Sequence, residues 1–354
     1  MRNISMIAVA AALVASAPAA QADAIADYFK GKNLTILIGY GAGGGYDTTT
    51  RIFARHFSKH LPGNPTIVPQ NMPGAGSMKV ANFVYNAAPK NGLTLGVFAS
   101  STALEPLFGN VKAKFETTKF NWLGSLHQDT ASCTVWKGAG QNIGTLDDLL
   151  KAKKTVLFGS TSPAAITSQH ALVLKNYLNA PVKVIYGYKG TKAVSLAMQN
   201  GEVHASCGMF ESSVKGAFSQ LVSSGDLKVF VQFGPDRAVP FFGNATRLYS
   251  KLKSEEDRSV LDLIFRQTQL ARPMAAPPGV PADRIAALRK AFMATLSDPA
   301  LIADAAKRKI EFNPLSGDEA SALFAKFAAT PEPLVRKAAA LIGKKISAPM
   351  RSRG

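Results

Sequence analysis

Residues 34–51 hold the pattern in this chain that is best suited to binding an anion. Five glycines lie among the seven residues from Gly39 to Gly45, directly after an apolar run and before a stretch with helical spacing. We expect a buried strand, a glycine turn and a helix that begins near Asp47. The first N–H groups of a helix have no partner within it, and they carry roughly half a positive charge. Because glycine leaves the backbone accessible, N–H groups around Gly44–Asp47 could bind a small carboxylate.

Other interpretations of this turn compete with a carboxylate site. Gly39-x-Gly41-x-x-Gly44 matches the dinucleotide fingerprint. However, no Asp or Glu follows Asp47 until Glu105, so the acidic residue that would hold a ribose about 20 positions further on is absent. A Walker A loop would need Gly-Lys-Ser/Thr at the helix start, which the chain lacks there. A structural turn with Asp47 as the helix N-cap stays open, and it is compatible with binding.

The elements that must position this turn alternate along the chain. The helix that begins near Asp47 runs towards Leu61, strands are expected at residues 64–69 and 93–98, and a further helix is expected from 78 to 86. Such alternation is typical of parallel βαβ units, whose ligands lie at the carboxyl ends of the strands. The turn at Pro73–Ser77 and the hydroxyls of Ser100–Thr102 should therefore lie at the same sheet edge as the glycine turn.

The middle of the chain repeats this arrangement. A strand at residues 155–159 precedes the hydroxyl-rich helix start Ser160–Ser162, and the helix continues to about residue 178. Further strands are expected at 182–186, 203–207 and 227–233, the last of them returning to the first unit. An extended crossing segment follows at 272–278, and amphipathic helices follow from residue 281. We therefore expect a second α/β unit with its own anion-binding helix start.

The composition and the N-terminus bear on compartment and partners. Arg2, the apolar stretch 4–15 and Ala20-Gln21-Ala22 have the pattern of a secretory signal peptide over residues 1–22. Its removal leaves 332 residues (354 minus 22), enough for two domains, and lowers the formal charge from +18 to +17. We expect a soluble exported protein, periplasmic if the organism is Gram-negative. Export argues against nucleic acid as a partner, whereas a basic surface attracts anionic solutes.

Few residues suggest other chemistry. Cys133 and Cys207 are the two cysteines, and they could form a disulfide or remain buried thiols; no His stands at metal-ligand spacing from either. His56 and His60 share a helix face but lack the Glu of the zinc-protease spacing, so we interpret them as surface positions. No Gly-x-Ser-x-Gly elbow is present. We therefore expect no metal, no cofactor and no enzymatic activity, with an exported hydrolase or lyase as the weaker alternative.

Several motifs in order make the chain resemble the solute-binding receptors of tripartite tricarboxylate transporters, the TctC or Bug family. They are Ile36–Asp47 with Arg51, Asn71–Ser77, Tyr186–Thr191 with Met198–Val203, Pro277–Pro281 and Ser297–Pro299. The resemblance implies a two-lobed α/β periplasmic-binding-protein fold of the Venus-flytrap, type II-like kind, with mostly parallel sheets and two hinge crossings. It also implies ligand contacts from Gly43–Thr48 and Ser160–Ser162.

We accordingly predict a first domain of residues 23–124 and 234–345, a second of residues 125–233 and a tail of residues 346–354. A small organic carboxylate would lie between the domains, and an integral-membrane permease would receive it from a monomeric receptor. An exported ligand sensor for signalling is the alternative. The predicted ligand-binding residues are Tyr40, Gly43, Gly44, Gly45, Tyr46, Asp47, Thr48, Gly76, Ser100, Ser101, Ser160, Thr161, Ser162 and Tyr188. Lys189 is either a charge partner or a solvated side chain.

Overall fold

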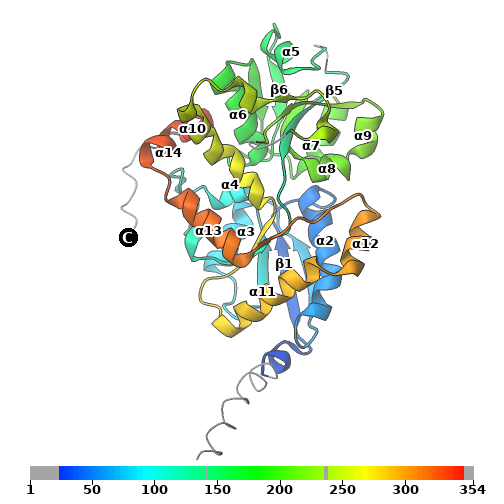
Figure 1. Cartoon of the computed structure of the whole chain (residues 1–354), viewed down its shortest axis with the longest axis vertical. Coiled ribbons are helices and arrows are strands. Elements are labelled where there is room, and N and C mark those ends of the chain that lie inside the picture. The colour runs from blue at the N-terminus through cyan, green and yellow to red at the C-terminus, as the bar shows by residue number, and fades with distance from the viewer. Residues whose placement is uncertain (1–23, 140–141, 235–237, 347–354) are drawn as a thin grey trace, which may run out of the picture.

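The computed structural model describes residues 24–139, 142–234 and 238–346. The expected signal peptide and all but the first residue of the expected tail lie outside these ranges. The described chain forms two lobes that lie one above the other, each a sheet with helices on its faces (Figure 1). The two-lobed α/β fold predicted from the sequence is confirmed.

The first lobe contains a sheet of six strands in the order β12-β4-β11-β3-β1-β2. These strands are β1 (Asn33–Ile38), β2 (Thr66–Asn71), β3 (Thr94–Val97), β4 (Asn121–Ser125), β11 (Pro273–Ala276) and β12 (Leu315–Ser316). β1 pairs in parallel with both β2 and β3, and Ile38 lies opposite Asn71 and Val97. The turns after these three strands therefore share one sheet edge, as the strand–helix alternation predicted.

The second lobe contains the other sheet of six strands, in the order β10-β9-β5-β8-β6-β7. Its strands are β5 (Ala131–Trp136), β6 (Val156–Gly159), β7 (Val182–Ile185), β8 (Ala205–Phe210), β9 (Leu227–Gln232) and β10 (Thr246–Arg247). β6 pairs in parallel with β7 and with β8, so the loops after these strands face the first lobe together. A disulfide joins Cys133 of β5 to Cys207 of β8.

The sheets are mixed, which corrects the prediction that they are mostly parallel. In the first sheet β11 runs antiparallel to β3 and β4, and β12 runs antiparallel to β4. In the second sheet β5 runs antiparallel to β8 and β9. The physical reason is topological: β5 and β11 are entered from the opposite lobe, so each crosses its sheet from the other end.

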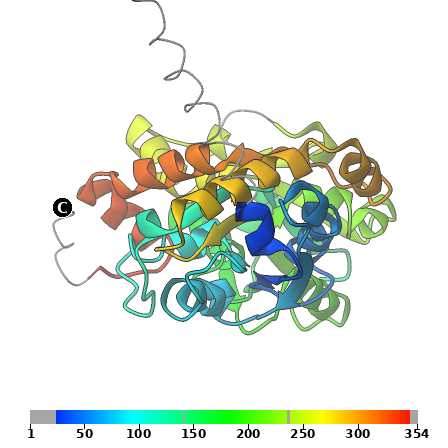
Figure 2. The ribbon, with the colours of Figure 1, turned by 90° about the horizontal axis from the view of Figure 1, so that it is seen from below.

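Helices cover both faces of each sheet. They are α2 (Gly45–Phe57), α3 (Met78–Asn86), α4 (Ser100–Ala103), α5 (Leu146–Leu150), α6 (Ile166–Leu178), α7 (Thr191–Gln199), α8 (Glu211–Lys215), α9 (Ser219–Ser223), α10 (Glu255–Phe265), α11 (Ala282–Leu296), α12 (Pro299–Ala306), α13 (Gly317–Ala328) and α14 (Glu332–Leu341). Of the C-terminal helices, α11, in gold, and α13, in orange, lie along one side of the first lobe (Figure 2).

Side chains from both faces of β1 are buried in the core of the first lobe. Leu34 and Ile36 are fully buried in the cluster that holds Phe53 of α2 and Phe292 of α11. Leu37 points to the other face, where a second cluster contains Trp122 stacked on Phe324 of α13 at 4.2 Å between ring centres. Side chains of a strand point alternately to its two faces, and both faces are apolar when the strand lies between two layers of helices.

The chain crosses between the lobes once more than predicted. Residues 126–130 and 266–272 are two crossings, and a third leads from α13, which packs on β4, to α14, which packs on α10 and α6. Lys344, after α14, then forms an ion pair with the fully buried Glu105 of the first lobe. The segment from α13 to Lys344 therefore connects the two lobes along their outer side (Figure 1).

Two predicted assignments near the second crossing need correction. The strand at 227–233 does not return to the first unit, because β9 pairs with β5 and β10 inside the second sheet. Tyr177 of α6 donates a hydrogen bond to Asp257 of α10 at 2.9 Å, which places α10 against the second lobe. We propose that β10, α10 and α14 belong with the second lobe, rather than with a first domain resuming at residue 234.

Acid should destabilise the fold through His170. Its ring packs against Phe233 and Phe265, and burial lowers its pKa from 6.5 to about 3. Below pH 6.5 the unfolded chain binds a proton that the folded state excludes, so stability falls with pH down to about 3. At pH 5 the loss is about 2 kcal/mol. Urea unfolding of wild type and His170→Leu at pH 7.5 and pH 5 measures it. Equal pH dependence of the two proteins would contradict this prediction.

Candidate functional site

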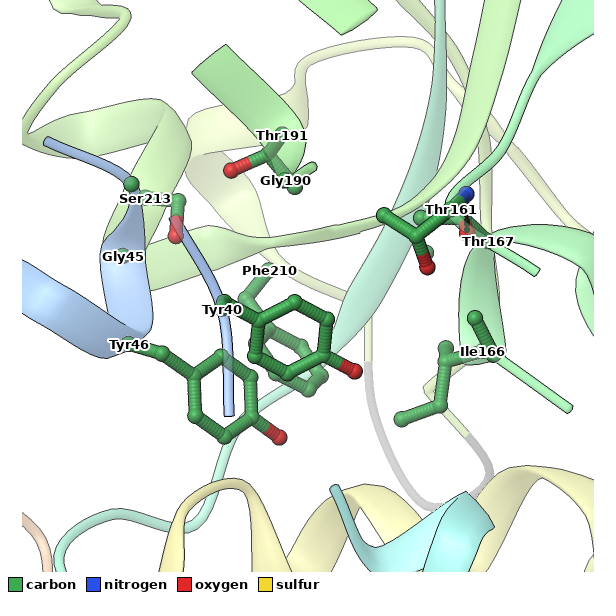
Figure 3. A pocket seen from close by; sticks show the side chains of 13 residues that line it. Tyr40, Gly45, Tyr46, Thr161, Ile166, Thr167, Gly190, Thr191, Phe210 and Ser213 are labelled. Carbon is green, nitrogen blue, oxygen red and sulfur yellow. Dashed lines mark hydrogen bonds between the residues drawn. The ribbon is translucent and has the colours of Figure 1, made fainter. Parts of the chain in front are cut away.

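A pocket lies between the lobes at the edge where their loops meet. Its cavity volume is about 40 Å³, enough for a few water molecules and smaller than the roughly 300–1,000 Å³ of typical small-molecule sites. The first lobe contributes Tyr40, Gly44, Gly45 and Tyr46, and the second contributes Thr161, Ala165, Ile166, Thr167, Gly190, Thr191, Gly208, Phe210 and Ser213. Figure 3 shows the rings of Tyr40 and Tyr46 side by side on one wall, with Thr161 and Ile166 across from them.

The start of α2 forms the first lobe's side of the pocket. The helix begins at Gly45 with Gly44 as its N-cap, two residues earlier than predicted. Asp47 is therefore not the N-cap. Its buried carboxylate instead accepts from Gly43 N–H at 2.9 Å and from Arg51 Nε at 2.7 Å. An acidic residue in the first turn that reaches back to the preceding backbone stabilises a helix start, and here it also fixes the glycine turn.

Two helix starts of the second lobe face α2. α6 begins after Ala165 and α7 begins after Gly190, and both N-cap residues line the pocket. The prediction included the loop before α6 but missed α7. A signal for it was present, since Gly190-Thr191 follows a strand in the same way as the first glycine turn does. Three long helices thus direct their unpaired N–H groups and positive dipole ends toward one pocket.

The two lobes touch through backbone and glycine. Gly41 N–H donates to Lys189 O at 2.9 Å, so Lys189 contacts the first lobe through its carbonyl group. A Cβ on Gly45 would lie 2.3 Å from Ser213 Oγ, and one on Gly76 would lie 2.2 Å from Ser162 Oγ. At these points only a residue without a side chain permits the observed approach. The structure therefore has its lobes closed on each other.

The predicted site residues fall into three groups. Tyr40, Gly44, Gly45, Tyr46 and Thr161 line the pocket. Gly43, Asp47, Thr48, Gly76, Ser100, Ser101 and Ser162 belong to the surrounding loops and helix starts without lining it. Ser160 and Tyr188 are used elsewhere: Ser160 Oγ hydrogen-bonds Thr167 Oγ1 at 2.7 Å, and Tyr188 Oη donates to Glu202 at 3.4 Å.

Several buried hydroxyls around the pocket have no hydrogen-bond partner among the described residues. They are those of Tyr46, Ser100, Ser101, Thr161 and Ser162. Buried polar groups in proteins are nearly always paired, so these hydroxyls are available to hydrogen-bond water or a polar ligand. Burial also raises the pKa of Tyr40 and of Tyr46 well above the usual value. Both phenols therefore stay protonated and act as hydrogen-bond donors at any physiological pH.

A buried ion pair beside the pocket was missed by the sequence reasoning. Arg272 and Asp129 come from two different crossings, are 1% and 0% exposed, and approach to 3.5 Å. Burial raises the pKa of Asp129, whereas the Arg272 guanidinium lowers it. Arg272 also lies over the rings of Tyr46 and Phe210, at 5.7 and 5.3 Å from their centres. A lone Arg in an extended segment gives no local signal of such a role, because its partners lie far away in sequence.

Other possible sites offer less. Within the described ranges, no group of three His, Cys, Asp or Glu side chains is arranged to hold a metal ion. His56 and His60 are half-buried and lie 3.2 Å from Asp304 and 2.9 Å from Asp298, so they join the end of α2 and the turn after it to α12 and its N-cap. None of the described helices is long and apolar enough to span a membrane.

Comparison by sequence gives one local match. No family model matches the chain. A protein of Cupriavidus necator described as a "UPF0065 protein in gbd 5'region" is 38% identical over 120 residues, which are 34% of this chain. The chain spans about a third of the length of that relative, since the match covers 33% of it.

Comparison by structure covers almost the whole chain. The periplasmic binding protein BugD superposes with a TM-score of 0.68 at 19% identity, over 88% of this chain and 97% of its own. MatC from Rhodopseudomonas palustris, with bound malate, has a TM-score of 0.66 at 17% identity, over 88% and 99%. R. palustris Rpa4515, with adipate, has a TM-score of 0.66 at 16% identity, over 87% and 97%. The resemblance stated from the motifs is confirmed at the level of fold: this chain has the fold of the Bug/TctC-type periplasmic binding proteins.

Proposed function

We propose that this protein is a periplasmic solute-binding receptor for a small organic carboxylate. The observation that carries the proposal is the convergence of the α2, α6 and α7 starts, with buried unpartnered hydroxyls, on one pocket between the lobes. N–H groups and hydroxyls are donors, and donors aimed at an enclosed space are suited to carboxylate oxygens. The malate and adipate named for two proteins of the same fold support this ligand class.

The geometry also favours a role in binding rather than turnover. The described pocket residues are glycines, hydroxyls and aromatic or aliphatic side chains, and none of them is a His or a carboxylate that could act as a general base. Asp129, a buried carboxylate beside the pocket, is engaged by Arg272 and by Ser212, whose N–H donates to it at 3.4 Å. We propose that the receptor is a monomer and passes its ligand to a tripartite tricarboxylate-type permease.

Binding would act through the closure of the lobes. A carboxylate held by α2 alone gains the donors of α6 and α7 when the lobes meet, so the ligand favours the closed state by its differential affinity. The hydrogen bond from Gly41 N–H to Lys189 O would also form whenever the lobes of the unliganded protein close.

A thermal-shift titration tests the proposal. Malate and adipate are compared with their diamides, which have similar shape but no negative charge. An acid at 100 times its dissociation constant stabilises the folded state by about 2.7 kcal/mol, or about 5 °C for a chain of this size. We expect a shift of this order with at least one acid and a much smaller one with its diamide. Equal shifts with acid and diamide, or conversion of the acid by the purified protein, would contradict the proposal.

A further inference from the structure

The surroundings of the Ser213 hydroxyl determine whether it acts as a donor or an acceptor in each of its hydrogen bonds. Its Oγ lies 3.3 Å from Arg272 Nη2, and a guanidinium group can only donate. Ser213 Oγ is therefore the acceptor in that contact, and its own hydrogen must point elsewhere. No acceptor for that hydrogen is found among the described residues. Ser213 is one of the residues that line the pocket, and Figure 3 shows its oxygen directed toward Gly45.

Several contacts fix the position of the Arg272 side chain. Its Nη2 donates to Ser212 Oγ at 2.9 Å, its Nη1 faces Asp129 at 3.5 Å, and its guanidinium carbon lies 5.7 and 5.3 Å from the ring centres of Tyr46 and Phe210. Its Nε has no partner in the described part of the chain. A buried cation fixed in this way polarises the hydroxyl to which it donates, and hydrogen bonds in series strengthen each other.

We propose that Ser213 donates a hydrogen bond to an anionic oxygen of the ligand, and that Arg272 is the positioning residue that fixes this polarity. The proposal deepens the carboxylate function and rests on it. Because Ser213 Oγ accepts from Arg272, the hydroxyl can offer a ligand only its hydrogen, and the site would favour a carboxylate oxygen over the NH₂ of an amide at that point. Ser213 and Arg272 thus become determinants of charge selectivity, although neither belongs to a motif recognised in the sequence.

Two neighbouring serines provide a matched test. Ser213→Ala removes the donor to the ligand, whereas Ser212→Ala removes a hydrogen bond to Arg272 and Asp129 but no atom that lines the pocket. Isothermal titration with malate and adipate should show affinity lower by about 10- to 150-fold in Ser213→Ala, the usual range for a hydrogen bond to a charged group. Ser212→Ala should lower the melting temperature more and the affinity less.

The role of Arg272 is tested through Ser213. If Arg272 acts by orienting that hydroxyl, Arg272→Lys should lower affinity in wild type and change it little in the Ser213→Ala background. The preference for each acid over its diamide should fall in both single variants. Full affinity in Ser213→Ala, with wild type still binding the acid, would overturn this inference and leave the proposed function standing. A wild-type protein that binds neither acid would overturn both.

Discussion

The variant Gly45→Ala is expected to bind the acids that stabilise wild type about 5- to 150-fold more weakly, as an overpacking cost of about 1–3 kcal/mol implies. The added Cβ would lie 2.3 Å from Ser213 Oγ on the opposite lobe and 3.0 Å from Arg272 Nη2. Within the first lobe, Gly45 is the first residue of α2, where Ala is well tolerated. The cost therefore falls on the closed state and spares the open one.

Isothermal titration gives the affinity of Gly45→Ala, and small-angle X-ray scattering shows whether the unliganded variant is more open than wild type. Gly44→Ala is the matched control: it makes the same change one residue earlier, where the nearest atom, Thr191 Oγ1, would be 3.3 Å away. It should lose less affinity. Wild-type affinity in Gly45→Ala would show that the lobes need not approach each other this closely at α2 to bind the ligand.

Removing the disulfide is expected to produce the largest change in stability. Cys133 and Cys207 are 74 positions apart, and closing a loop of that length lowers the entropy of the unfolded chain by an amount worth about 4 kcal/mol. Both residues are fully buried in paired strands of the second sheet, so the native structure should change little when Ala replaces both. Guanidinium unfolding of Cys133→Ala/Cys207→Ala against wild type measures the difference.

Reduced wild type is the control for the disulfide. Unfolding in the presence of excess dithiothreitol should bring its midpoint close to that of the double variant, because reduction removes the same constraint. A double variant whose free energy of unfolding stayed within about 1 kcal/mol of oxidised wild type would contradict the loop-closure argument. In that case the stabilisation from the bridge would be offset elsewhere in the native state.

Predictions from local pattern were correct where the structure depends on neighbouring residues. The strand at 34–38, the glycine turn and the helix to Phe57 follow from apolar alternation and glycine content, and the register of β1 with β2 and β3 places their loops at one edge. The exact helix start was wrong, because an Asp can stabilise a helix from the first turn as well as from the N-cap.

Relations between distant segments could not be read from the residues. Whether Cys133 and Cys207 pair, which sheet receives residues 227–232, and whether α14 crosses the hinge all depend on strand pairing and helix packing over long separations. Arg272 illustrates the same limit at the site. The role of its side chain depends on contacts with Asp129, Ser212 and Ser213, which are 143, 60 and 59 positions away in the sequence.

The residues of this chain alone were sufficient to predict strands, helix starts and a preference for anions, since these follow from backbone geometry and side-chain type within a few positions. Which helix starts face each other is decided by the closed arrangement of the two lobes. Contacts such as Gly41 N–H with Lys189 O and Gly45 against Ser213 join elements of different lobes. Their geometry depends on how the two lobes are oriented by three crossing segments, and no short-range pattern in a sequence encodes that orientation.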